Sequence, residues 1–267
     1  MNPRPLFKNT VPRIFLPSAY VTDNRLSITD EKAHYLLSVL RCRKGDHLIV
    51  FDGSGNCFRT SIIKAHRTEV IAEIIEQFFC DHESHLHIIL IQGILKGEKM
   101  DMIIQKTTEL GVNEIVPAVT ERSQLRDTRR VKRWRKIAEE ASRQSGRSVV
   151  PVVHEPVELK KVLTSYASQS TPQGFIFYEE EGMKLSEAVK VFPTKGSKNP
   201  SPLVGEGKGE GELLILIGPE GGFSREEVTF AEEKGFLVMS LGKRILKAET
   251  AAISAVTLVQ YLFGDMG

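Results

Sequence analysis

The sequence predicts an α/β fold in which a mostly parallel sheet, covered on both faces, follows a small β-rich unit. From about residue 85 onward, apolar runs of strand length alternate with helical segments, which is typical of parallel sheets. Before about residue 80, three short β-rich runs follow a single helix, as in a small barrel or curled sheet. We therefore expect two domains, residues 1–80 and residues 81–267.

The first domain is expected to contain one helix and three strands. Apolar residues at helical spacing predict a helix over residues 29–40, with Thr29 as its N-cap. β-rich runs predict strands over residues 47–51, 57–65 and 68–75, and the turn sequence DGSGN joins the first two.

The second domain is expected to contain buried strands separated by helices. Apolar runs predict strands over residues 85–92, 114–119, 149–153, 174–179, 213–217 and 237–241. Helical periodicity predicts helices over residues 98–110, 127–145 and 248–263. A further helix begins at Ser224, because Glu227 completes a capping box and Phe223 with Val228 forms a hydrophobic staple.

Residues 195–211 are rich in Gly, Ser, Pro and Lys. Such a composition offers too little apolar surface to offset the entropy of ordering the backbone. We expect a mobile surface insertion that carries no chemistry.

Composition places the chain among cytoplasmic globular proteins. Hydrophobic residues make up 41% and charged residues 26% of its 267 residues, and no apolar run approaches the length of a membrane span. The first residues show no apolar segment typical of a secretion signal. Cys42, Cys57 and Cys80 are odd in number and widely spaced, which argues against a disulfide framework and for a reducing compartment.

One segment is strongly basic. Residues 122–147 contain ten Lys or Arg against three Asp or Glu, a local charge of +7 in a chain whose net charge is +2. A basic stripe on a near-neutral protein is typical of a polyanion-binding surface, although a solvated helix face is the simpler interpretation.

Two glycine turns are the best candidates for a ligand site. Residues 218–222, GPEGG, come directly after a buried strand, and Gly242 follows the next predicted strand. Because ligands of parallel sheets bind at the carboxyl ends of strands, two neighbouring strand ends with glycine turns indicate a ligand read mainly by main-chain groups. A tight turn without a ligand remains the alternative for each loop alone. The GPEGG loop matches neither a Walker loop nor a dinucleotide fingerprint.

No metal is expected. The best candidate ligands are Cys80, His82, His85 and His87, whose spacing matches no common zinc pattern.

Four motifs in order resemble the 16S ribosomal RNA uridine N3-methyltransferases of the SPOUT superfamily. They are ILKGEKMDMIIQKTTELGVNEIVPAVTERS, WRKIAEEASRQSGR, IGPEGGFS and LGKRILKAETA, and the likeness extends to RIF and AHYLLSVLRCRKGD near the N-terminus. The resemblance implies a PUA-like barrel at residues 1–80 and, at residues 81–267, a SPOUT domain with a trefoil knot. It also implies a homodimer, S-adenosylmethionine as cofactor and 16S ribosomal RNA, within the small (30S) subunit, as substrate. Residue patterns alone would predict an unknotted sheet.

The resemblance also assigns residues. Cofactor binding falls on Gly218, Pro219, Glu220, Gly221, Gly222, Leu241, Gly242, Ile245, Leu246 and Thr250, with a third loop after residues 177–180. The RNA-binding face takes in Arg13, Arg41, Lys96, Lys99, Arg122, Gln144 and Arg147. The chain departs from the family pattern at Lys247, where arginine is frequent and whose ammonium lacks the planar fork of a guanidinium, and at Tyr35, which replaces a histidine.

Methylation of uracil N3 requires removal of its proton and stabilisation of the resulting anion. We expect Arg244, with Arg147 as a second candidate, to stabilise the charge on the uracil oxygens. Glu220 and Glu249 are the candidate proton acceptors, and the sequence does not decide between them.

Two other functions remain open. A nucleotide-phosphate enzyme would use GPEGG as an anion loop, and would bind nucleoside triphosphates rather than S-adenosylhomocysteine. A noncatalytic RNA-binding assembly factor would use the barrel and the basic helix alone, which leaves both glycine turns unexplained.

Overall fold

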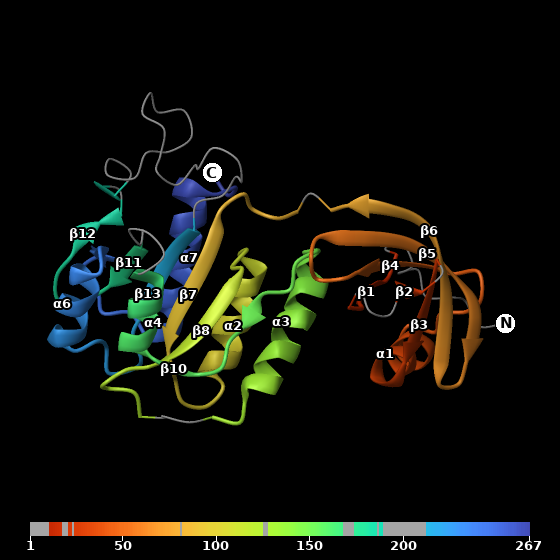
Figure 1. The fold of residues 1–267 in the computed structure, drawn as a ribbon, viewed down its shortest axis with the longest axis horizontal. Helices are drawn as coiled ribbons and strands as arrows, with labels where there is room; N and C mark the ends of the chain where they lie inside the picture. Colours follow the sequence, from red (N-terminus) through yellow and green to blue (C-terminus); the bar gives the residue numbers. More distant parts are fainter. Residues whose placement is uncertain are drawn as a thin grey trace. The chain divides into compact units, whose positions relative to one another are not determined.

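The computed structural model describes residues 11–17, 21–22, 24–80, 82–124, 128–167, 174–185, 187–188 and 212–267 (Figure 1). They form two compact units: Met1–Glu83 with Ser142–Val150, and Ser84–Ala141 with Pro151–Gly267. The sequence assigned residues 142–150 to the second domain, whereas the structure groups them with the first unit. The reason is local pairing, since Val149 bridges to Gly53 and the Val149 backbone N–H donates to Glu83.

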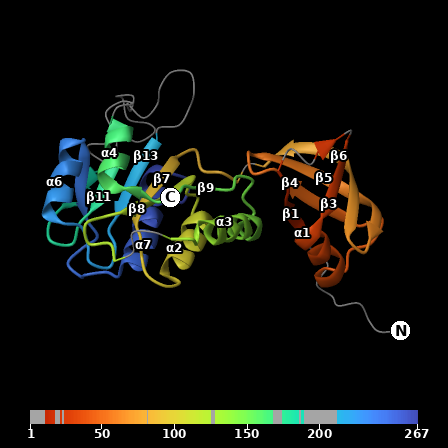
Figure 2. The ribbon, with the colours of Figure 1, turned by 60° about the horizontal axis from the view of Figure 1, so that its bottom comes forward.

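The first unit is a six-stranded sheet in the order β1-β4-β5-β6-β3-β2. Its strands are β1 (Arg13–Phe15), β2 (Val21–Thr22), β3 (Arg25–Thr29), β4 (His47–Phe51), β5 (Asn56–His66) and β6 (Glu69–Phe79). The three predicted strands are confirmed as β4, β5 and β6, with β5 and β6 longer than expected. α1 (Asp30–His34) packs against β3 and β6 (Figure 2). Its buried Ala33 joins Leu26, Ile28 and Val70 in one apolar core.

The predicted helix over residues 29–40 is shorter and changes type. After α1 the chain forms a π-helical turn, η2 (Tyr35–Val39), in which the Leu40 N–H donates to the Tyr35 carbonyl five residues earlier. Thr29 is the N-cap residue, as predicted, but its hydroxyl donates to the Asp30 carboxylate rather than capping a backbone N–H.

Cys57 and Cys80 form a disulfide, so the expectation that the cysteines are unpaired was wrong. Although 23 residues separate the two cysteines in sequence, antiparallel pairing of β5 with β6 brings their Cα atoms to 6.1 Å. The spacing of the cysteines in sequence did not predict the disulfide, because a β-hairpin brings residues that are distant in sequence close together in space. Cys42 is buried and is not part of this disulfide.

The second unit contains an eight-stranded parallel sheet, as predicted. Its order is β10-β8-β7-β13-β11-β14-β12, with β9 also paired to β8. The strands are β7 (His87–Gly93), β8 (Glu114–Val119), β9 (Val152–Val153), β10 (Val157–Glu158), β11 (Gly174–Phe177), β12 (Met183–Lys184), β13 (Glu212–Ile217) and β14 (Phe236–Ser240). The predicted strand over residues 149–153 is reduced to the two residues of β9.

Helices cover both faces of this sheet. They are α2 (Lys99–Glu109), α4 (Leu159–Ala167), α6 (Arg225–Glu233) and α7 (Ala248–Phe263). A further helix, α3 (Val131–Ser145), begins in this unit, and its residues from Ser142 onward belong to the first unit. α2 packs against α7 and α4 against α6 (Figures 1 and 2). Alternate strand residues face opposite sides, so Ile89 and Ile91 pack in a cluster with α4 and α6 residues. None of the helices in the described part of the chain combines the length and apolar character needed to cross a bilayer.

The order of strands corrects one expectation. β13 and β14 are consecutive long strands in sequence, and we expected them to be neighbours. In the sheet β11 lies between them, with Phe175 paired to Ile215 on one side and to Leu237 on the other. The predicted insertion over residues 195–211 and Asp127, the expected first residue of the basic helix, lie outside the described residues.

Candidate functional site

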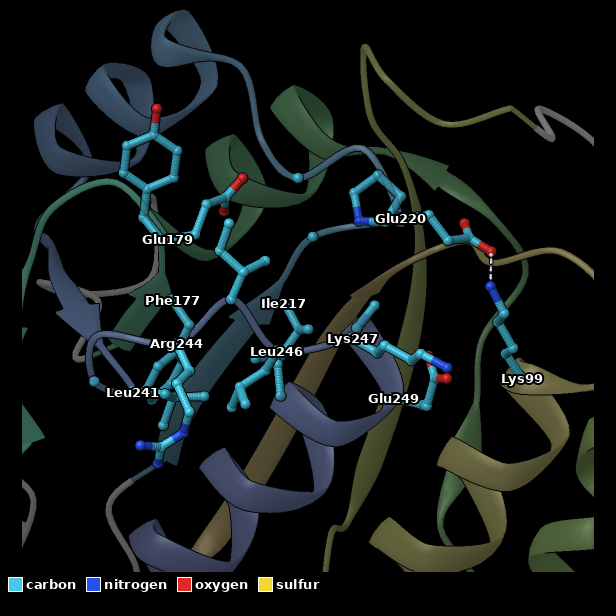
Figure 3. A pocket seen from close by; sticks show the side chains of 18 residues that line it. Lys99, Phe177, Glu179, Ile217, Glu220, Leu241, Arg244, Leu246, Lys247 and Glu249 are labelled. Atoms are coloured by element: carbon cyan, nitrogen blue, oxygen red, sulfur yellow. Dashed lines mark hydrogen bonds and ion pairs between the residues drawn. The ribbon is translucent and has the colours of Figure 1, made fainter.

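A pocket opens where β13, β11 and β14 end and α7 begins (Figure 3). Because the three strands are parallel, their carboxyl ends meet at one edge of the sheet. The pocket therefore collects three loops that are far apart in sequence. They are residues 218–222 after β13, 177–179 after β11 and 241–247 after β14.

The 218–222 turn is held close to the end of β7. A Cβ added at Gly93 would lie 2.5 Å from the Pro219 nitrogen, so only glycine permits this approach. The Gln92 side chain, fully buried, donates to the Gly218 carbonyl at 3.2 Å and to the Gly93 carbonyl at 2.9 Å. Sequence analysis missed Gln92, although a glutamine inside an apolar strand was a usable signal.

The next helix fixes the other end of this turn. Ser224 and Glu227 form the predicted capping box, and Phe223 and Val228 are buried in one cluster. Glu227 also accepts from the Glu121 backbone N–H at 2.8 Å, which links the turn to the loop after β8.

Gly218, Pro219, Glu220 and Gly222 line the pocket, whereas Gly221 does not. The Arg122 guanidinium donates to the Gly221 carbonyl at 3.0 Å, and a Cβ at Gly221 would meet the Arg122 side chain. Gly221 therefore contacts Arg122 and does not contribute to the pocket surface.

The loop after β14 forms the opposite wall. Leu241, Gly242, Arg244, Ile245 and Leu246 line the pocket, and Gly242 has a φ of +106°, which favours glycine. Ile245 is 86% exposed, and Arg244 is exposed too. In Figure 3 the Arg244 guanidinium extends away from Glu220 and Glu249, so the structure does not bring Arg244 together with either candidate proton acceptor.

α7 contributes Ala248, Glu249 and Ala251 to the pocket, but not Thr250, which is exposed. Of the ten predicted cofactor-binding residues, Gly221 and Thr250 are thus the two that lie outside the lining. Lys247, the N-cap residue of α7, lines the pocket as well.

The loop after β11 supplies the middle of the site. Phe177, Tyr178 and Glu179 line the pocket, and the Tyr178 N–H donates to the Met239 carbonyl at 3.0 Å. The resemblance implied this segment only as a third loop, because no local pattern reveals that β11 lies between β13 and β14.

Glu220 is held by lysines at the start of α2. Its carboxylate accepts from the Lys99 ammonium at 2.9 Å and from the Lys96 backbone N–H at 3.2 Å. Burial alone would raise the pKa of Glu220, but these hydrogen bonds outweigh it and lower the pKa. The bond to Glu220, with the charge of Glu249, raises the pKa of Lys99. Glu220 is therefore kept ionised and is a weaker proton acceptor than an unpaired carboxylate.

The predicted RNA-binding residues divide between the two units. In the second unit Lys96, Lys99 and Arg122 lie beside the 218–222 turn, as their bonds to Glu220 and Gly221 show. In the first unit Arg41 and Gln144 are exposed.

Arg147 and Arg13 have structural partners. The Arg147 side chain is 4% exposed, and its Nη2 lies 2.7 Å from the Glu83 Oε2 atom. Arg13, which is half-buried, donates to the Arg147 carbonyl at 2.9 Å. A buried, neutralised guanidinium is not available to RNA or uracil, so the structure argues against both roles predicted for Arg147.

Two other cations of the basic segment are exposed and paired. Arg133 lies 2.8 Å from the Asp101 carboxylate and Arg135 lies 3.0 Å from the Glu155 carboxylate. Trp134 anchors the same helix, because its buried ring donates to Asp101 at 3.1 Å. Arg126 lies outside the described residues.

Within the described residues, no cluster of three or more His, Cys, Asp or Glu side chains is placed to hold a metal. Cys80, one of the four candidate ligands, is bonded to Cys57.

Comparison with protein families supports the two-unit interpretation. Residues 82–260 match the family described as RNA methyltransferase domain, and residues 28–75 match the family described as RNA methyltransferase PUA domain. The ribosomal RNA small subunit methyltransferase E of Buchnera aphidicola is 30% identical over 263 residues, which cover 96% of this chain and 95% of the relative. The Bacillus subtilis protein of that name is 32% identical over 240 residues, or 88% and 89% of the two chains.

Solved structures have the same fold. The ribosomal RNA small subunit methyltransferase E of Neisseria gonorrhoeae, bound to S-adenosyl methionine, has a TM-score of 0.82 at 33% identity, and the match covers 97% of this chain and 100% of that chain. A methyltransferase of Legionella pneumophila, in complex with the same cofactor, has a TM-score of 0.80 at 31% identity, with 96% and 99% covered. The fold is therefore of the SPOUT type, with an N-terminal PUA-like domain.

These matches confirm the resemblance drawn from the four motifs. Since the RNA methyltransferase domain spans more than half of the chain and named relatives match nearly all of it, the protein belongs to the ribosomal RNA small subunit methyltransferase E family.

Proposed function

We propose that this protein transfers a methyl group from S-adenosylmethionine to N3 of a uridine in 16S ribosomal RNA. The observation that carries the proposal is the convergence of three loops on one pocket at the carboxyl edge of the sheet. The Neisseria and Legionella proteins of this fold bind S-adenosylmethionine, and the family acts on ribosomal RNA of the small subunit by name.

The pocket has the chemistry that S-adenosylmethionine requires. Ile217, Leu241 and Leu246 offer apolar surface to an adenine ring, and glycine turns leave main-chain groups accessible. Nothing lies within 4 Å of a Cβ built at Gly242, so the backbone faces open space there. The residues that would hold the cofactor are Gly218, Pro219, Glu220, Gly222, Leu241, Gly242, Ile245 and Leu246.

S-adenosylmethionine supplies an electrophilic methyl group when bound. The chain must then remove the uracil N3 proton and stabilise the anion that forms. We assign proton acceptance to Glu249, because Glu220 is tied to Lys99 and its pKa is lowered. We assign anion stabilisation to Arg244, whose exposed loop would have to place the guanidinium over the uracil oxygens when RNA binds.

RNA binding is proposed for the exposed groups of both units. Lys96, Lys99 and Arg122 would contact phosphates near the pocket, and Arg41 and Gln144 would contact RNA from the first unit. We retain as parts of the proposal a PUA-like domain at residues 1–80, a knotted domain at residues 81–267, a homodimer, the assembled 30S subunit as substrate, and the cytoplasm as compartment.

The direct test is methyl transfer. Purified protein, radiolabelled S-adenosylmethionine and either naked 16S RNA or 30S subunits from cells that lack the modification should give one labelled uridine, mapped by its block to reverse transcription. No transfer to either substrate would contradict the proposal.

The two alternative functions give different results in cheaper measurements. A nucleotide-phosphate enzyme would be stabilised against heat by nucleoside triphosphates and not by S-adenosylhomocysteine. A noncatalytic assembly factor would bind RNA and transfer no methyl group.

A further inference from the structure

We infer that Glu179 accepts hydrogen bonds from the ribose hydroxyls of the methyl donor. It thereby favours a donor whose ribose carries both the 2′ and the 3′ hydroxyl. This inference rests on the proposed function and goes beyond it, because the carboxylate is not among the residues that the family motifs assign. It comes from the loop after β11, which lies between the two glycine turns.

Glu179 is positioned by the 218–222 turn. A Cβ added at Gly222 would lie 2.3 Å from the Glu179 Oε1 atom, so the carboxylate occupies the space that a side chain at Gly222 would fill. Gly222 has a φ of +68°, a second reason why glycine is favoured there. In Figure 3 the carboxylate lies beside this turn at the pocket wall.

The Glu179 carboxylate is not satisfied by the protein. Among the described residues, no hydrogen bond or ion pair holds it, whereas Glu220 accepts from Lys99 and Lys96. An ionised carboxylate can only accept hydrogen bonds, and its two oxygens provide about four acceptor positions. A ligand that fits against it must therefore supply hydroxyl or amine donors.

The distribution of charge indicates which part of the donor lies there. Lys99, Glu220 and Glu249 lie together on the side of the pocket opposite Glu179 in Figure 3, with Lys247 beside Glu249. That side carries both signs of charge and suits the zwitterionic amino-acid end of the methyl donor. The adenosine end is then left for the side with Glu179 and apolar Phe177.

Within adenosine the ribose diol fits this carboxylate best. Its 2′ and 3′ hydroxyls are adjacent donors, and one carboxylate can accept hydrogen bonds from both. The amine of adenine is a single donor group, and it belongs to the ring that we place against apolar side chains. Carboxylate recognition of a ribose hydroxyl recurs in nucleotide-binding proteins for the same chemical reason.

Calorimetric titration of S-adenosylhomocysteine and of its 2′-deoxy and 3′-deoxy forms tests the inference without relying on activity. The wild type should bind the two deoxy forms about tenfold more weakly than the parent ligand. Glu179→Ala should bind the parent about tenfold more weakly and should no longer distinguish it from the deoxy forms. Glu187→Ala is the control, since Glu187 is an exposed glutamate outside the pocket lining, and it should behave as the wild type.

The outcomes separate the two claims. If the wild type binds S-adenosylhomocysteine and Glu179→Ala still discriminates against the deoxy forms, or binds the parent undiminished, the ribose assignment is wrong. If the wild type does not bind S-adenosylhomocysteine at all, the proposed function fails and the ribose assignment fails with it.

Discussion

The two edges of the parallel sheet use charged side chains in opposite ways. At the amino edge Glu114, the first residue of β8, has partners on both oxygens, at 3.2 Å from the His87 Nε2 and 2.7 Å from the His154 Nε2. The bond to His87 is the largest cause of its lowered pKa, and burial opposes the shift. Nearby, burial and the charge of Glu114 raise the pKa of Tyr166 to about 12.

At the carboxyl edge the backbone turns through glycines and leaves polar groups exposed to a pocket. Glu220 is paired there, but the described residues place no partner on the Glu179 carboxylate, and Arg244 is exposed. The comparison teaches that charge at this sheet is not in itself a sign of function. Groups that satisfy one another stabilise the fold, and groups that lack partners beside a glycine turn are available to a ligand.

The largest effect is expected at Arg244, an exposed cation in the pocket lining. Arg244→Ala should lower the single-turnover methyl transfer rate about 100-fold to 1,000-fold, because a donor that stabilises developing negative charge is lost. The unfolding free energy should not change, since Arg244 is exposed.

The matched control is Lys243→Ala, a neighbouring exposed cation that does not line the pocket. It should transfer methyl groups at the wild-type rate with saturating RNA and cofactor. An undiminished rate for Arg244→Ala under those conditions would remove this residue from the mechanism.

A second prediction concerns how the carboxyl edge is built. Gly93→Ala places a Cβ 2.5 Å from the Pro219 nitrogen. This nitrogen is a backbone atom of the turn after β13, the strand paired with β7, so moving it costs free energy. We expect a loss of about 1–3 kcal/mol in unfolding free energy by urea titration. Binding of S-adenosylhomocysteine should weaken as well, since the displaced turn lines the pocket.

Gly45→Ala separates steric displacement from backbone strain. Gly45 has a φ of +89° and nothing within 4 Å of a built Cβ, so only conformational strain is expected there, about 1 kcal/mol. This change in the first unit should leave ligand binding intact. Equal binding by both variants would mean that Gly93 does not position the turn.

Local features of the fold were predictable because they depend on neighbours in sequence. The capping box at Ser224 and the helix over residues 248–263 needed only residues within a few positions, and both are present. The place of β11 was not predictable, since strand order in a parallel sheet depends on crossover connections rather than on local pattern.

Dependence on contacts between residues far apart in sequence also explains the predictions that differed from the structure at single residues. Arg147 lies in a basic run typical of an RNA surface, but its side chain is buried and pairs with Glu83, which is 64 residues away in sequence. Cys57 and Cys80 are brought together by strand pairing. In the site, glycine turns were visible in sequence, whereas the unsatisfied carboxylate of Glu179 required the arrangement of three loops.

The smallest effect is expected at the amino edge, and it depends on pH. A carboxyl whose pKa is lower in the folded than in the unfolded state stabilises the fold above its ordinary pKa of 4.5, and that contribution is lost as the pH falls. His87→Ala removes the largest cause of the lowered pKa of Glu114, and should cost about 1 kcal/mol of unfolding free energy at pH 7. The difference from wild type should shrink as the pH falls below 4.5 and Glu114 is protonated, because the ion pair with His87 is then lost in the wild type too. His66→Ala, an exposed histidine of the first unit, should match the wild type throughout. A difference that stayed constant across this range would show that His87 stabilises the sheet by packing alone, and the contrast between the two edges would then lose its electrostatic basis.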